Sequence, residues 1–127
     1  MNPPAMVLKW QSAWQSLDPD AVAALYAPDG THMSDVVIKR MGRADGTLKG
    51  SDELRAYAQA GVAQLQSFRI DIIDVIAQTE NKRGRASVEY WRVVNGDEAS
   101  RKRVVEILEW TDDRLALIHI SEPTRPY

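Results

Sequence analysis

The fold class is decided by residues 68–111, FRIDIIDVIAQTENKRGRASVEYWRVVNGDEASRKRVVEILEWT. Three runs within this stretch, 68–78, 85–94 and 101–111, are rich in β-branched and aromatic residues, a composition typical of strands. The two breaks between them, ENKRG and NGDE, contain the residues that hairpin turns favour. The stretch therefore predicts an antiparallel meander of three long strands.

The chain before this meander begins with helical periodicity. Apolar side chains recur every three or four positions from Pro4 to Leu17, which predicts an amphipathic helix. Asp18-Pro19-Asp20 then supplies a capping carboxylate and a proline suited to the first helical turn. We therefore expect a short second helix over residues 21–26.

Turn residues follow the second helix. Ala27-Pro28-Asp29-Gly30 should end it, because proline disfavours helix at the residue before it, and residues 31–38 can then form a strand. A short extended segment at 47–49 precedes a third helix, which is capped at Ser51 and keeps an uninterrupted apolar face to Leu65. Helices followed by a meander indicate an α+β domain with its helices on one face of the sheet.

Composition limits the classes of partner. The chain has 127 residues, of which 44% are hydrophobic, and a formal net charge of -2, which suits one globular domain. So weak a charge provides no basic surface, and we expect neither nucleic acid nor a membrane as a partner. Cysteine is absent, which excludes disulfides and thiolate chemistry, and no apolar run approaches the roughly 18 residues of a membrane span. We expect a cytoplasmic enzyme or binding domain.

The order of these elements and two local sequences resemble one family. YAPDGTH at residues 26–32 follows the second helix, and LKGSDEL at residues 48–54 opens the third. This combination resembles the SnoaL-like polyketide cyclases, relatives of ketosteroid isomerase and limonene epoxide hydrolase in the nuclear transport factor two superfamily. The resemblance implies a cystatin-like α+β barrel, in which a cone-shaped, curved antiparallel sheet has three N-terminal helices packed on its concave side. A small-molecule pocket is expected inside the cone.

The end of the chain departs from the family pattern. A closing strand begins at Asp112-Asp113-Arg114-Leu115, but LIHISEPTR at residues 117–125 resembles a sequencing adapter translated in frame. We therefore expect a SnoaL-like domain over residues 1–116 and a non-native tail over residues 117–127, from a gene assembled out of environmental DNA. His119 is for this reason not a site candidate, although residues 115–120 could still pair as a strand.

Metal and nucleotide chemistry have no support in the sequence. Its only histidines are His32 and His119, and no HExxH motif is present. Lys49-Gly50-Ser51 lacks the glycine pattern of a phosphate-binding loop. We expect no metal and no cofactor.

His32 is the first candidate for acid–base chemistry in a pocket. It follows the turn at the start of the expected first strand, and alternation places Ser34 on the same face. The resemblance implies that this pair of positions holds a water in the epoxide hydrolase and that the isomerase has its general base at the position of Ser34. Serine cannot act as that base, and Asp35 is one residue out of place. A hydrogen-bonded histidine of the core or rim is the alternative interpretation of His32.

Glu106 is the second candidate. Glu106 and Glu109 are three residues apart on one strand and must face opposite sides of the sheet, so one of them should point inward. The resemblance implies that Glu106 matches the protonated acid in the oxyanion hole of ketosteroid isomerase, with Trp10 at the position of a partner tyrosine. Burial among apolar side chains raises the pKa of a carboxyl group, which suits it to proton transfer near neutral pH.

Glu89 is the third candidate. If its face of the strand points inward, Glu89 and Trp91 both line the pocket, and the resemblance implies a position near the acid of the epoxide hydrolase pair. Ser87 stands where that enzyme requires an arginine, so this mechanism lacks a part. Aromatic residues are expected first in the core, and several of them would also form the wall of a pocket for a flat or hydrophobic ligand: Trp10, Trp14, Tyr57, Trp91 and Trp110.

The leading hypothesis is a cofactor-independent enzyme of the isomerase, cyclase or epoxide-hydrolase type. It would act on a small hydrophobic molecule with the three candidates above as its acid–base groups. The alternative is a ligand-binding or assembly domain of the same fold without turnover. A homodimer is also expected, because helices on one face of the sheet leave the other face partly apolar through Ile73, Val88 and Ile107.

Overall fold

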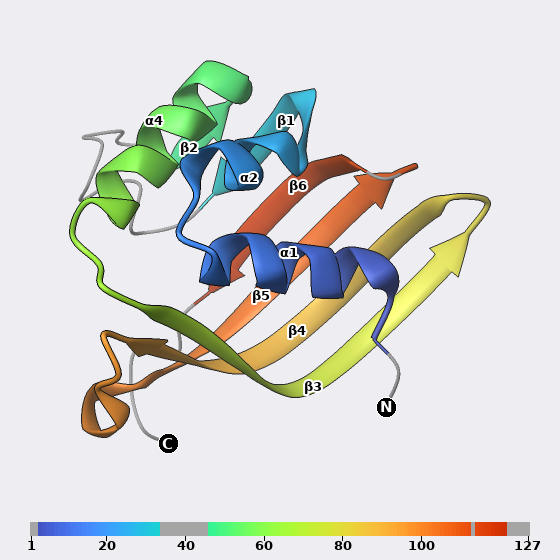
Figure 1. Cartoon of the computed structure of the whole chain (residues 1–127). Helices are drawn as coiled ribbons and strands as arrows, with labels where there is room; N and C mark the ends of the chain where they lie inside the picture. The colour runs from blue at the N-terminus through green and yellow to red at the C-terminus, as the bar shows by residue number, and fades with distance from the viewer. Residues whose placement is uncertain (1–2, 34–45, 113, 122–127) are drawn as a thin grey trace.

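The computed structural model describes residues 3–33, 46–112 and 114–121, and its elements follow the expected order (Figure 1). The expected helices and the three-stranded meander are confirmed. The elements are α1 (Ala5–Gln15), α2 (Pro19–Ala24), β1 (Tyr26–Met33), β2 (Thr47–Lys49), α4 (Ser51–Val62), β3 (Phe68–Glu80), β4 (Arg83–Val94), the 3-10 turn η1 (Glu98–Ser100), β5 (Lys102–Thr111) and β6 (Arg114–Ser121).

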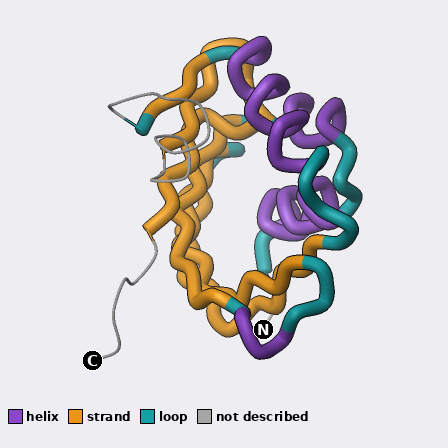
Figure 2. Tube along the Cα trace, turned by 90° about the vertical axis from the view of Figure 1, so that its left-hand side faces the viewer, coloured by secondary structure: helices purple, strands orange, loops and turns teal. Residues whose placement is uncertain are grey.

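The strands form one curved sheet in the order β2-β1-β6-β5-β4-β3. Figure 2 shows the helices together on one side of this sheet, so the expected α+β cone with helices on its concave face is confirmed. One detail differs from the expected antiparallel sheet. β1 and β6 run parallel, which makes the sheet mixed. This pairing joins the first described strand of the chain to the last.

Strand β1 begins earlier than expected. Residues 27–30, predicted as the turn that ends the second helix, lie inside β1, and the register with β6 shifts between Tyr26 and Thr31. A Cβ on Gly30 would lie 3.0 Å from the carbonyl oxygen of Leu115, so glycine allows β6 to approach the irregular part of β1. Residues 34–38 of the expected strand lie outside the described residues.

The starts of two helices follow from local chemistry. Asp18 Oδ1 accepts a hydrogen bond from the backbone N–H of Asp20 at 3.0 Å, and Pro19 occupies the first turn, as predicted for α2. Helix α4 is capped one residue earlier than expected. Gly50, with a φ of 88°, holds the cap position that we predicted for Ser51.

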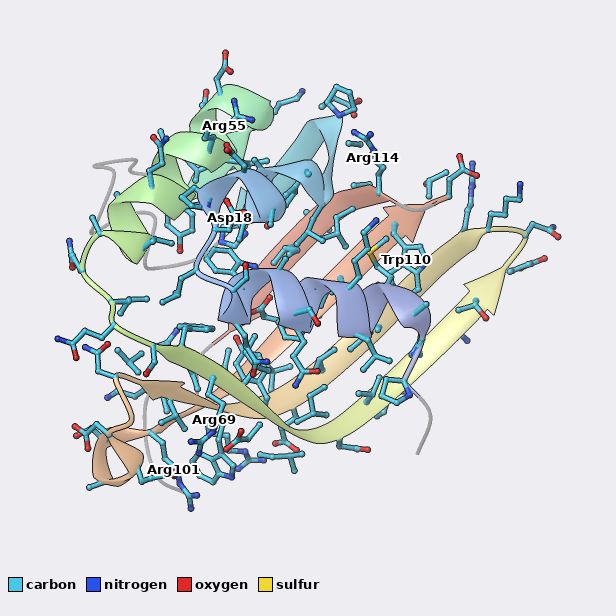
Figure 3. All side chains as sticks on the ribbon, in the orientation of Figure 1. Asp18, Arg55, Arg69, Arg101, Trp110 and Arg114 are labelled. Atoms are coloured by element: carbon cyan, nitrogen blue, oxygen red, sulfur yellow. The ribbon has the colours of Figure 1, made fainter. Side chains whose placement is uncertain are left out.

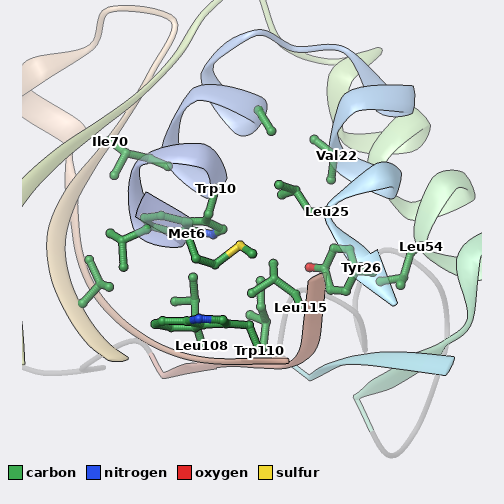
Figure 4. Close-up of a cluster of buried hydrophobic side chains, with 14 of the residues drawn as sticks. Met6, Trp10, Val22, Leu25, Tyr26, Leu54, Ile70, Leu108, Trp110 and Leu115 are labelled. Carbon is green, nitrogen blue, oxygen red and sulfur yellow. The ribbon is translucent and has the colours of Figure 1, made fainter. Parts of the chain in front are cut away.

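The core lies between α1 and the concave face of the sheet. Figure 4 shows Met6 and Trp10 from the helix above Leu108, Trp110 and Leu115 from the strands, and each of the five is at most 7% exposed. Burying one such side chain stabilises the fold by roughly 1.5–3 kcal/mol, so this cluster is a main source of stability.

Two glutamines of α1 bind the backbone of β3. Gln11 Nε2 donates to the carbonyl oxygen of Ile70 at 2.7 Å, and the N–H of Ile70 donates to Gln15 Oε1 at 2.8 Å. The two bonds satisfy both backbone groups of one residue. They hold α1 above the sheet at a fixed position and so fix one wall of the space between them.

Strand β6 contains part of the expected tail. It lies between β1 and β5, and Ile118 is fully buried. Residues 117–121 therefore pair within the sheet, as we allowed for residues 115–120. The assignment of residues 117–127 as non-native remains a prediction. Within the described residues, no helix is long and apolar enough to cross a membrane.

Candidate functional site

A cavity of about 280 Å³ lies between the helices and the concave face of the sheet. This volume is just below the usual range for ligand sites, roughly 300–1,000 Å³, so only a small ligand fits. Most of its wall is apolar and comes from α1, α4, β3, the end of β4 and the segments that follow the two helices: Trp14, Leu17, Val62, Leu65, Phe68, Ile70 and Val94. The polar lining residues are few: His32, Tyr57, Tyr90, Arg92 and Glu106.

Glu106 points into this cavity from β5. Alternation along the strand buries every second residue from Val104 to Trp110, so Glu106 lies on the concave face while Glu109 faces outward, where it pairs with Arg85. The Glu106 residue is 4% exposed. The hydroxyl of Tyr90 donates a hydrogen bond to Glu106 Oε1. The structure therefore holds a carboxyl group among apolar walls, with a phenol as one of its partners.

His32 enters the same cavity from β1. It is 1% exposed, and its Nδ1 lies 2.9 Å from the hydroxyl oxygen of Tyr26. Its Nε2 is buried and has no hydrogen-bond partner among the described residues. The ring centroid of His32 lies 5.0 Å from that of Tyr57 and 6.5 Å from that of Trp14, so aromatic walls hold the imidazole plane in place.

Burial sets the protonation states of this pair. Desolvation lowers the pKa of His32 from 6.5 to about 3, so the imidazole is neutral at neutral pH. Burial also raises the pKa of Tyr26 well above its usual value, and the negative charge of Glu106 and the nearby Tyr57 raise it further. Tyr26 thus keeps its hydroxyl proton beside a neutral imidazole.

His32 should make the fold less stable as the pH falls from about 6.5 to about 3. The unfolded imidazole takes up a proton below pH 6.5, whereas the buried one stays neutral down to about 3, so the unfolded state binds more protons in this window. Linkage then predicts that a change from pH 7 to pH 5 lowers the free energy of unfolding by about 2 kcal/mol through His32 alone.

Urea unfolding at pH 7 and pH 5 measures this loss, with His32→Gln as the control variant. The variant should lose about 2 kcal/mol less than the unaltered protein over the same interval, because other groups titrate equally in both. An equal loss in the two proteins would show that His32 does not carry the proton linkage.

Glu89 and Trp91 do not line the cavity, which corrects the expectation for both. Glu106 pairs directly with Val88 in the β4–β5 register, and directly paired residues share a face, so Glu89 must face away from the helices. There Glu89 accepts a hydrogen bond from Arg103 Nε at 2.6 Å. The guanidinium carbon of Arg101 lies 4.0 Å from the ring centre of Trp91.

Of the other residues expected in the cavity wall, some line the cavity and others lie elsewhere. Trp14 and Tyr57 line the cavity. Trp10 is fully buried behind the site and makes an edge contact with Tyr90, with centroids 5.4 Å apart. Trp110 does not line this cavity and covers Gly84, where a Cβ would lie 2.0 Å from its Cζ2. Ser34 lies outside the described residues.

Figure 3 shows Arg69 and Arg101 at the end of the sheet near the β4–β5 hairpin, away from Trp110. Arg69 there binds Asp71, with Nε and Oδ1 2.8 Å apart, and also binds Glu98. These bonds are largely exposed. Exposed ion pairs of this kind contribute little to stability.

Three residues of the site were missed by sequence reasoning. Tyr26 was placed at the end of the second helix, but it begins β1 and contacts His32. Tyr90 and Arg92 were missed because β4 was considered with Glu89 and Trp91 inward. The register of the β4–β5 hairpin would have found both. It pairs Glu106 with Val88, so an inward Glu106 places Val88, and with it Tyr90 and Arg92, on the concave face.

In the part of the chain that the structure describes, carboxylates and histidines do not form a set of metal ligands. Among residues 3–33, 46–112 and 114–121, no three His, Cys, Asp or Glu side chains lie together as a metal site requires. The arrangement that is present brings a carboxyl group, a neutral imidazole and two phenols to one apolar cavity. Such a set can bind a small molecule and move a proton on it.

The chain belongs to the SnoaL-like domain family, whose model matches residues 7–118. Its fold is similar to that of a SnoaL-like protein of unknown function from Burkholderia thailandensis, with 19% identity, a TM-score of 0.74, and coverage of 91% of this chain and 88% of that one. None of the curated proteins matches this sequence.

Two further structures with the same fold hold ligands. A protein with a ketosteroid isomerase-like fold from Catenulispora acidiphila, in complex with trimethylamine, has 16% identity and a TM-score of 0.70, and covers 97% of this chain and 88% of that one. The orange carotenoid protein of Anabaena (Nostoc), binding canthaxanthin, has 12% identity and a TM-score of 0.77, and covers 98% of this chain and 38% of that one. At such identities the likeness establishes the fold alone.

Proposed function

We propose that this protein is a cofactor-independent enzyme that moves a proton on a small, largely hydrophobic molecule. The observation that supports this proposal is the joint presence of Glu106 and neutral His32 on one apolar cavity. A cavity lined by apolar groups alone would favour storage or transport of a ligand. A carboxyl group in such a cavity loses its hydration, which costs free energy. Buried carboxyl groups of this kind are therefore typical of catalytic sites.

The two groups have different roles in this proposal. With a pKa of about 3, His32 is too weak a base to remove a proton from carbon at neutral pH, so Glu106 is the residue that takes and returns it. In this proposal the Tyr26 hydroxyl keeps its proton and donates a hydrogen bond to His32 Nδ1, so the imidazole proton is on Nε2. The Nε2–H group then donates a hydrogen bond to a substrate carbonyl oxygen.

This division favours an isomerase-type or cyclase-type proton transfer over epoxide hydrolysis. The hydrolase version required Glu89 beside the site, and Glu89 lies on the face away from the helices. Proton transfer next to a carbonyl requires a base and a donor to the oxygen, and Glu106 and His32 supply both. The enolate that forms would be stabilised by the buried donor, since its charge develops where water is excluded.

Deuterium exchange tests this function without knowledge of the natural substrate. Small cyclic and aromatic ketones are incubated with the protein in D₂O, and loss of the proton signals next to the carbonyl is followed by NMR. Exchange faster than in buffer is expected for at least one ketone that fits the cavity. If the ketones bind but none exchanges faster, the protein is a ligand-binding domain of this fold, which is the alternative function.

We also propose a homodimer that forms through the face of the sheet away from the helices. Ile76, Ser87 and Ile107 are register neighbours on this face, and Ile76 is 70% exposed. Ile73, 40% exposed, is the extra residue of the adjacent bulge. Val88 was expected to contribute but is fully buried on the concave face. A second copy of the chain would cover this apolar row.

Light scattering at micromolar concentration should give twice the mass of one chain. Ile107→Lys should give monomers, because it places a charge in the proposed interface. Gln59→Lys adds the same charge on an exposed position of α4 and should leave the dimer intact. A monomeric unaltered protein would contradict the proposal.

A further inference from the structure

Arg92 is a charged residue in a mainly apolar cavity wall. It alternates with Tyr90 on β4 and therefore points to the concave side, where it lines the cavity and is half-buried. Among the described lining residues it carries the only full positive charge. Glu106 and His32 are almost completely buried, so Arg92 lies at the more open end of the same space.

A second cation faces the same side at this point. Lys102 is the direct partner of Arg92 in the β4–β5 register, so both side chains belong to the concave face, and Lys102 is exposed. Two cations on neighbouring positions of one face favour an anionic ligand group at this end of the cavity.

The distance between the two polar ends follows from the register. Val88 pairs with Glu106, and Arg92 lies four residues further along β4, about 13 Å at the usual strand rise of roughly 3.3 Å per residue. The side chains of Arg92 and Glu106 occupy part of that length. The remaining space, within a cavity of about 280 Å³, suits one small ring between two polar groups.

We infer that the substrate is a small cyclic keto acid, whose carboxylate is bound by Arg92 and Lys102 while its carbonyl faces His32 and Glu106. This assignment rests on the proposed function and adds the substrate class to it. The apolar wall from α1 and α4 would contact the ring. Arg92 and Lys102 are binding residues in this arrangement and take no part in the proton transfer.

Calorimetric titration with matched ligand pairs tests the assignment. The probes are 4-oxocyclohexanecarboxylate and 4-acetylbenzoate, each compared with its primary amide. Charge-assisted hydrogen bonds to a partly buried guanidinium should make each acid bind at least about tenfold more tightly than its amide. If no acid binds more tightly than its amide, including the case in which nothing binds, the assignment is overturned.

Variants identify the cations responsible. Arg92→Met should remove most of the preference for acid over amide, and Lys102→Met should reduce it. Arg85→Met removes an exposed arginine on the face away from the helices and should leave the preference unchanged. A preference that survives in Arg92→Met, with the fold verified by circular dichroism, would overturn the role of Arg92. If Arg92→Met does not fold, Arg92→Gln takes its place with the same expected outcome.

The outcome is separable from that of the proposed function. Glu106→Gln should keep the preference for acids, since Glu106 does not contact the carboxylate. If acids bind through Arg92 but neither they nor any other ketone exchanges protons faster than in buffer, the keto acids stand as a ligand class and the enzymatic function fails. If ketones without a carboxylate exchange protons readily and no acid binds more tightly than its amide, the proposed function stands and this inference fails.

Discussion

Glu106→Gln should slow proton exchange by at least a hundredfold and leave the fold unchanged. General acid–base groups contribute roughly 10² to 10⁴ in rate, and glutamine keeps the shape of the side chain while it loses the ability to take a proton. Its amide oxygen can still accept the hydrogen bond from Tyr90 that Glu106 Oε1 accepts. The measurement is the exchange rate by NMR, with circular dichroism to verify folding.

Glu109→Gln is the matched control for this experiment. It removes a carboxylate three residues away on the same strand, on the opposite face, where Glu109 pairs with Arg85. Its exchange rate should equal that of the unaltered protein. His32→Ala should lower the rate as well, because it removes the donor to the carbonyl oxygen. Full activity in both Glu106→Gln and His32→Ala would reject the site.

A chain that ends after residue 116 should not fold. In the described sheet, β6 alone joins the β1–β2 pair to the meander, so its loss divides the sheet into two parts. Ile118, fully buried, is also the register partner of His32. Removing one buried isoleucine side chain costs about 2–5 kcal/mol, and the lost strand pairing adds to that, against a total stability of about 5–15 kcal/mol.

A chain that ends after Ser121 is the control. It keeps β6, and the removed segment contains Pro123 and Pro126, which cannot donate ladder hydrogen bonds. Its melting temperature should fall by no more than a few degrees, equivalent to roughly 1 kcal/mol. If the chain that ends after residue 116 showed a cooperative melting transition, residues 117–121 would be dispensable for folding even though they pair in the sheet.

Much of the fold could be predicted because its signals are local. The periodicity of α1, the cap at Asp18 and the turns of the meander each depend on a few consecutive residues. The parallel pairing of β1 with β6 could not be predicted, since it joins segments more than 80 residues apart (Tyr26 with Leu115) and depends on no local motif. The irregular start of β1 was missed for the same reason, because Gly30 is required by the approach of β6.

The site could be predicted where the spacing of charged residues showed which side chains share a face of a strand. Glu106 and Glu109 had to lie on opposite sides of β5, and the inward position of Glu106 agrees with that argument. Strand β4 offered two similar faces, one with Val88 and Tyr90 and one with Glu89 and Trp91, each with an aromatic residue. Only the pairing with β5 decides between them, so the phase of one strand depends on its neighbour.

The bonds from Gln11 and Gln15 to Ile70 also affect how the protein resists aggregation. Among the described strands, β3 lies at one end of the sheet, and a free strand edge is a template on which another chain can add a strand. The glutamines occupy both backbone groups of Ile70 and so block such addition beside the cavity. Helix α1 cannot lift from the sheet to admit a ligand without uncovering that edge. A ligand that enters by a route that leaves α1 in place would therefore keep the β3 edge covered, and the protein would not self-associate through that strand during ligand binding.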